Sequence, residues 1–100
     1  WAPLLAHELA HEWIGVRALE LASEREEWLK EGACELVAWL ELARAGSIER
    51  ERWLAWLDET LDAYRSEAGT GSLCEAGARK QERRGLVYGG GALVCLALEL

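Results

Sequence analysis

The stretch His7-Glu8-Leu9-Ala10-His11 contains both histidines of the chain, four positions apart. On an α-helix, residues at this spacing lie about 40° apart around the axis and one turn apart along it. His7 and His11 therefore point the same way and can hold one metal ion. Glu8 lies at the rim, where its carboxylate reaches a metal-bound water without binding the metal. This HExxH pattern predicts a zinc site on a helix; two buried histidines that match by chance are the alternative.

The residues around this motif predict a buried helix from Pro3 to about Gly15. Proline suits the first helical turn, because the N–H that it lacks has no partner inside the helix there. Leu5, Leu9 and Trp13 lie on the face opposite the histidines, and a helix that is apolar nearly all round is normally buried. We therefore expect the metal site to lie inside the domain.

A catalytic zinc site needs a third protein ligand and one open position for water. The chain has 18 acidic residues, and among them Glu31 stands out. It lies in Trp28-Leu29-Lys30-Glu31-Gly32, on the next expected helix, with nineteen residues between it and His11. Glu35 follows one turn later and is our candidate for the carboxylate that accepts the free ring N–H of a ligating histidine. A surface glutamate is the alternative for Glu35.

These two stretches read His-Glu-Leu-Ala-His-Glu-Trp and Trp-Leu-Lys-Glu-Gly. Together they resemble the zinc core of the gluzincin metallopeptidases, most closely the aminopeptidase N and glycyl aminopeptidase families. The resemblance implies that His7, His11 and Glu31 bind Zn²⁺ and that Glu8 is the general base. The interval between the second histidine and the glutamate is one residue longer than in aminopeptidase N relatives.

The segment from Tyr88 to Val94 resembles the Tyr-x-Lys-Gly-Ala segment of both families. The family tyrosine stabilises the oxyanion of the tetrahedral intermediate, which implies that role for Tyr88. Taken together, the similarities imply a zinc-dependent, aminopeptidase-like metallopeptidase. It would hydrolyse peptide bonds by means of a zinc-bound water activated by Glu8.

Two other functions fit the same motifs. The first is a zinc-bound or metal-free structural or interaction domain that derives from such a peptidase and has lost activity. Gly90, which takes the place of the family's lysine, favours it, and the intact Glu8 speaks against it. The second is an HExxH protease that cleaves a repressor, which needs neither the Glu31 stretch nor the Tyr88 segment and ranks last.

Length and charge limit the partners of the chain. One hundred residues make one domain, residues 1–100, and a core of that size is marginal without a metal, a partner or the rest of a larger protein. The chain has no starting Met, and its first residues already look like the start of a buried helix, so we expect a segment of a longer protein. The net charge of −7 argues against nucleic acid and anionic membrane surfaces as partners. The resemblance to the gluzincin peptidases implies a peptide substrate. The apolar run 85–98 is shorter than the ~20 residues that span a bilayer.

The fold class expected is all-α, because apolar–polar alternation is absent and alanine, leucine and glutamate dominate. The resemblance implies a helical bundle like the thermolysin-like catalytic α-domain, with the HExxH helix packed against the Glu31 helix. Residues 16–22 can continue the first helix or form a loop. We expect a second helix from the Ser23–Glu26 capping box to Ala45, which Gly46 stops, and a third helix capped by Ser47. A turn should follow at 69–72, then a short helix at 73–80 and a last helix from Leu86.

Several further residues carry expectations of their own. Three consecutive glycines, 89–91, cost about 3 kcal/mol of helix propensity relative to alanine, which favours close approach of another backbone or a substrate over a simple loop. Cys34 is expected near the site as a small buried residue, and the basic residues 79–84 as a solvated linker. We expect Trp13 and Trp28 to line the site. The tryptophans expected to pack between helices are Trp39, Trp53 and Trp56.

Overall fold

Helices form the regular secondary structure of residues 1–14 and 23–99, which are the residues that the computed structural model describes. These residues contain no β-strand, which confirms the all-α class. In chain order the elements are α1 (Ala2–Ala10), η1 (Glu24–Glu26), α2 (Glu27–Arg44), α3 (Arg50–Glu67), α4 (Leu73–Ala76), η2 (Gly77–Arg79), η3 (Gly85–Gly90) and α5 (Gly91–Glu99). The η3 segment is a π-helical turn that runs directly into α5.

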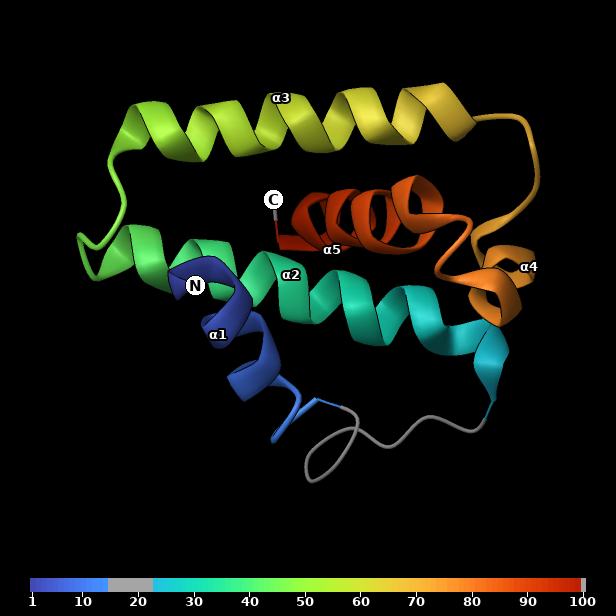
Figure 1. Cartoon of the computed structure of the whole chain (residues 1–100), viewed down its shortest axis with the longest axis horizontal. Coiled ribbons are helices and arrows are strands. Elements are labelled where there is room, and N and C mark those ends of the chain that lie inside the picture. Colours follow the sequence, from blue (N-terminus) through green and yellow to red (C-terminus); the bar gives the residue numbers. More distant parts are fainter. Residues whose placement is uncertain (15–22, 100) are drawn as a thin grey trace.

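The segment η3–α5 is drawn between the two longest helices, α2 and α3 (Figure 1), and its buried part is η3 with the first turn of α5. Both α5 and η3 contact α2, and η3 also contacts α3. Helix α1 packs against α2, so the HExxH helix contacts the helix that carries Glu31, as expected. The radius of gyration is 13.0 Å, and a packed domain of this length has a value of about 13 Å.

Stacked tryptophans form the core between α2 and α3. Trp39 and Trp56 are buried, with ring centroids 5.1 Å apart and ring planes inclined by 14°. Trp53 lies against Trp56 at 6.0 Å. Aromatic pairs of this kind contribute about 0.5–1.5 kcal/mol beyond the area that they bury. The expected packing of these three residues between helices is confirmed.

The three consecutive glycines at the junction of η3 and α5 let neighbouring helices approach closely. A Cβ on Gly91 would collide with the carbonyl oxygen of Trp28 in α2, and one on Gly90 would lie 2.7 Å from Leu73 in α4. A Cβ on the first of the three would lie 3.2 Å from a backbone oxygen of α3. The expected close approach of another backbone is confirmed, and the segment is helical rather than a loop.

The C-terminal end of α2 follows the prediction, and it also moves the start of α3. Gly46 adopts a φ of +73°, and its N–H donates to the carbonyl of Ala43 at 3.1 Å. The N–H of Ser47 donates to the carbonyl of Leu42 at 2.9 Å. This pair of bonds is the Schellman motif. Because Ser47 belongs to the end of α2, the prediction that it caps the next helix is wrong, and Glu49 is the N-cap of α3.

The first helix is shorter and less buried than predicted. It ends at Ala10, and His11 keeps helical angles (φ −63°, ψ −22°) in the turn that follows. Leu5, Leu9 and Trp13 are 60%, 59% and 62% exposed. The expectation of a buried helix is wrong, because α1 lies on α2 through its histidine face and its opposite face is open.

The remaining boundaries agree with the sequence within a few residues. Ser23 and Glu26 form the predicted capping box ahead of α2. The turn at 69–72 is present, with Gly69 at a φ of +85°, and the expected short helix is α4 followed by η2. Residues 16–22 lie outside the described residues. Among the described helices, none combines the length and the apolar character that crossing a membrane requires.

Candidate metal centre

Three side chains from α1, the turn after it and α2 converge on one point. His7 Nε2 lies 3.2 Å from Glu31 Oε2, and His11 Nε2 lies 3.1 Å from the same oxygen. The two nitrogens are 3.1 Å apart. His7 and Glu31 are buried, and His11 is partly buried. The structure thus brings together the three residues that the sequence analysis assigned as metal ligands.

The spacing of these three atoms fits a zinc ion. Zinc binds imidazole nitrogen and carboxylate oxygen at about 2.0–2.2 Å, usually with tetrahedral geometry, which separates neighbouring ligand atoms by roughly 3.3–3.5 Å. The three observed separations of 3.1 to 3.2 Å form a nearly equilateral triangle of almost that size. One ion can therefore contact all three atoms and keep a fourth position for water.

The hydrogen-bonding roles of the same atoms also require either a second proton on His7 or a metal ion between them. His7 Nδ1 lies 2.7 Å from Glu35 Oε2, so this nitrogen carries a proton and donates it to the carboxylate. In the neutral ring, Nε2 is then an acceptor, and it faces the acceptor oxygen of Glu31. Two acceptors this close repel each other unless a proton or a metal ion lies between them. The site is therefore built for a positive charge.

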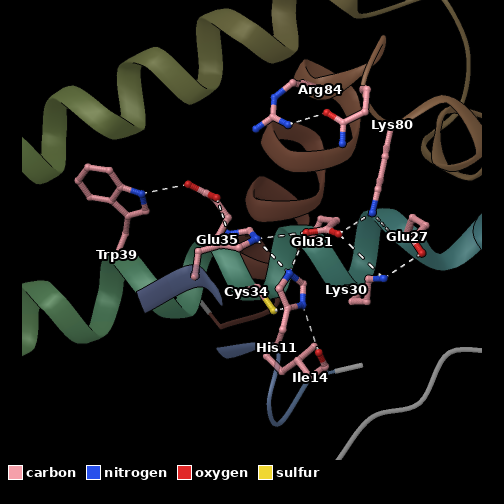
Figure 2. Close-up of polar contacts among 12 residues, drawn as sticks. His11, Ile14, Glu27, Lys30, Glu31, Cys34, Glu35, Trp39, Lys80 and Arg84 are labelled. Atoms are coloured by element: carbon pink, nitrogen blue, oxygen red, sulfur yellow. Dashed lines mark hydrogen bonds and ion pairs between the residues drawn. The ribbon is translucent and has the colours of Figure 1, made fainter. Parts of the chain in front are cut away.

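Glu35 lies where the sequence analysis expected it, against the ring of a predicted ligand. Its second oxygen accepts a hydrogen bond from Trp39 Nε1 at 3.1 Å (Figure 2). One carboxylate therefore orients the ring of His7 and is itself held by a tryptophan of the core. Carboxylates in this position fix the tautomer of a ligating histidine and raise its basicity.

The ring of His11 is held by different partners. Its Nδ1 lies 3.4 Å from the carbonyl oxygen of Ile14 and 3.2 Å from Cys34 Sγ. Cys34 is fully buried, and burial raises the pKa of its thiol to about 12, so the sulfur keeps its proton. The expected position of Cys34 near the site is confirmed. The sulfur contacts Nδ1 of the His11 ring, whereas Nε2 is the ring atom that faces Glu31 (Figure 2).

Glu8 and Tyr88 line one cavity together with His7. The cavity has a volume of about 420 Å³, and its walls include the apolar side chains of Trp1, Leu4 and Trp39. The ring of Tyr88 lies 5.9 Å from the ring of His7, with an angle of 27° between the planes. The expected general base and the expected oxyanion donor thus face the same space as a predicted ligand. Small-molecule sites typically occupy ~300–1,000 Å³.

Two basic side chains from the expected solvated linker reach the site. Lys80 Nζ lies 2.9 Å from Glu31 Oε1 (Figure 2), and the guanidinium of Arg84 lies 4.1 Å from the ring centre of Tyr88. The interpretation of this cluster as a linker that only faces solvent is therefore wrong for these residues. These contacts could not be predicted from local pattern, because Lys80 and Glu31 are 49 positions apart in the sequence. Helical spacing gives no signal for this contact, because residues 80–82 form a turn between η2 and η3.

The ligand set carries charges that hold one another in place. Burial lowers the pKa of His7, but hydrogen bonds to Glu31 and Glu35 outweigh it and raise the pKa from 6.5 to about 9. Burial raises the pKa of Glu31, but hydrogen bonds from His7 and Lys80 outweigh it and lower the pKa from 4.5 to about 2. Burial, together with the charge of Glu31, raises the pKa of Tyr88, so its hydroxyl keeps the proton that it needs as a donor.

Without metal, the chain is expected to lose stability as the pH rises from 6.5 to about 9. A group whose pKa is raised on folding stabilises the folded chain at a pH below its unfolded pKa, and this stabilisation is lost as the pH rises through its folded pKa. For His7 the stabilisation is on the order of 3 kcal/mol. The lowered pKa of Glu31 acts oppositely: its contribution is present above 4.5 and lost as the pH falls toward about 2. The metal-free chain should therefore be most stable between pH 4.5 and pH 6.5.

Urea unfolding with a chelator present, from about pH 5 to pH 9, measures this dependence. A His7→Gln variant lacks the titrating group and should show a flatter curve at high pH. With zinc present the trend should reverse, because ligands bind metal only when deprotonated. A metal-free stability that stays level up to about pH 9 contradicts the assignment.

Comparison of the chain with models of protein families gives no match, and comparisons with curated proteins and with solved structures give none either. The likeness to the gluzincin families therefore rests on the two zinc stretches and the Tyr88 segment. Function must be argued from the geometry of the site.

Proposed function

We propose that this chain is the helical core of a zinc-dependent, aminopeptidase-like peptidase in which His7, His11 and Glu31 bind the ion. The observation that carries the proposal is the triangle of ligand atoms, 3.1 to 3.2 Å apart, beside the cavity lined by Glu8 and Tyr88. Structural zinc sites normally have four protein ligands. Among the described residues, the ligand cluster has three. An open fourth position supports a catalytic rather than a structural site.

The residues beside the triangle supply the steps of peptide hydrolysis. A bound zinc ion polarises a carbonyl and lowers the pKa of water toward ~7. Glu8 accepts a proton from the attacking water, whose oxygen forms a bond to the carbonyl carbon. When the C–N bond breaks, Glu8 passes the proton to the leaving amine. Tyr88 donates a hydrogen bond to the oxyanion, a contact worth about 3–4 kcal/mol in other enzymes.

The finer assignment of the fold belongs to the same proposal. The packing of α1 on α2, with the ligands at the contact, supports a likeness to the thermolysin-like catalytic α-domain. We propose two partners for such a core: a peptide substrate on which it acts, and further domains of a longer chain.

A structural or interaction domain without activity is the second candidate, and two observations favour it. The ion pair of Lys80 with Glu31, together with a protonated His7, balances the charges of the site without a metal. Gly90 takes the place of the family's lysine, and any Cβ there would lie 2.7 Å from Leu73. A lysine at this position would therefore require the tip of the Leu73 side chain to move.

Zinc titration of the chelator-treated chain tests the first proposal. We expect one zinc ion per chain, and hydrolysis of unblocked aminoacyl anilides that stops when the metal is removed. His11→Ala should weaken zinc binding by more than the ~10–100-fold typical of losing an outer partner, because it removes a ligand.

A matched control for this titration lies on α2. Glu31→Gln should lose zinc as His11→Ala does, whereas Glu41→Gln changes an exposed carboxylate that pairs with Arg44 and should bind zinc normally. Circular dichroism checks that each variant keeps its helices. A wild-type chain that binds no zinc, or a His11→Ala chain that binds it unchanged, overturns the metal site.

A further inference from the structure

The two oxygens of the Glu31 carboxylate have different neighbours. Oε2 faces both imidazoles, at 3.2 Å from His7 and 3.1 Å from His11. Oε1 points the other way and accepts a hydrogen bond from Lys80 Nζ at 2.9 Å (Figure 2). The side chain of Glu31 is only 5% exposed, so this lysine is a specific partner in place of solvent.

Lys80 is held in place by contacts of its own. Its ammonium also donates to Glu27 Oε2 at 3.2 Å, and the other oxygen of Glu27 pairs with Lys30 at 3.0 Å. Lys80 directly follows η2, whose first residue, Gly77, packs so closely that a Cβ there would collide with the carbonyl oxygen of Glu24. The segment that carries the ammonium is therefore fixed against the start of α2.

A carboxylate can bind a metal through one oxygen or through both, and the choice changes the number of positions left open. A charged donor on one oxygen favours binding through the other. A catalytic zinc site needs a free position for water. Whether Glu31 binds through one oxygen or through both therefore decides whether that position stays open.

We propose that Lys80 is a positioning residue that keeps Glu31 a single-oxygen ligand and so preserves the open metal position. This inference rests on the proposed zinc site and adds a residue that the resemblance does not include. Lys80 contacts the ligand through the oxygen that faces away from the histidines. It therefore acts on the metal through Glu31 and not directly.

Cobalt(II) replaces zinc in such sites and reports coordination number by its visible absorption, which is intense for four ligands and weak for five. The cobalt-loaded wild-type chain should show the intense band of three protein ligands plus water. In Lys80→Met, Oε1 loses its hydrogen bond and keeps only the more distant Lys30 Nζ, at 4.0 Å, so it can turn to the metal and the band should lose most of its intensity. Lys80→Arg keeps a charged donor and should restore the wild-type spectrum.

Arg79→Met is the matched control, because it removes the same charge one residue away from an exposed side chain that pairs with Glu82. Its spectrum should equal that of the wild type. Lys80→Ala repeats the test without a bulky side chain, and circular dichroism confirms folding of each variant.

The outcomes separate this inference from the proposed function. A wild-type chain that binds no cobalt overturns both. A wild-type chain with an intense band that both Lys80→Met and Lys80→Ala leave unchanged overturns the positioning role alone. A weakened band that Lys80→Arg restores supports it.

Discussion

Replacement of Glu8 by glutamine is expected to lower the turnover number by about 10²–10⁴-fold, the usual contribution of a general acid–base residue. Glutamine has nearly the same size but cannot take a proton from water. Glu8 lines the cavity beside His7 and is not one of the three ligand side chains. The Glu8→Gln chain should therefore bind one zinc ion with wild-type affinity.

Steady-state kinetics on an aminoacyl anilide, with zinc titration of the same samples, measure both parts of this expectation. Glu12→Gln is the control, since it removes an equal charge four residues later from an exposed side chain outside the cavity lining. A Glu8→Gln chain with wild-type turnover excludes Glu8 as the base. A wild-type chain that binds zinc but hydrolyses nothing points to the second candidate, the structural domain.

Local pattern was enough to predict the common direction of the two histidines and the main helices. The spacing of His7 and His11 fixes their common direction on any helix, and Glu35 follows Glu31 by one turn whatever the rest of the chain does. Gly46 predicted the end of α2, because only a residue that tolerates positive φ suits that position. These features depend on neighbours within about one turn of helix.

Features that depend on distant partners were missed or wrong. The apolar character of α1 predicted burial, but burial depends on which elements cover a helix, and α1 has one face open. Ser47 has the chemistry of an N-cap, yet the end of α2 uses its N–H. Lys80 reads as a surface lysine in its local sequence, and only the fold brings it to Glu31.

Gly32 shows how packing and the metal site depend on the same position, and its replacement by alanine should strongly lower the free energy of unfolding. A Cβ on Gly32 would collide with the backbone of Gly91 in α5 and lie 2.5 Å from its Cα. Backbone atoms cannot turn aside as a side chain can, so α2 and α5 must separate. We expect a loss of about 3 kcal/mol or more, at the upper end of the cost of overpacking, although alanine favours helix by ~1 kcal/mol.

Urea unfolding of Gly32→Ala measures that loss, with Gly89→Ala as the control. The control adds the same methyl group to a helical glycine whose nearest neighbour would be 3.2 Å away, so it should change the stability by less than ~1 kcal/mol. Because Gly32 directly follows Glu31, separation of the helices also moves the ligand, and zinc binding should weaken in Gly32→Ala alone. Equal stabilities for the two variants contradict the close packing of α2 on α5. Unchanged zinc affinity in a destabilised Gly32→Ala chain shows instead that the ligand position does not depend on this contact.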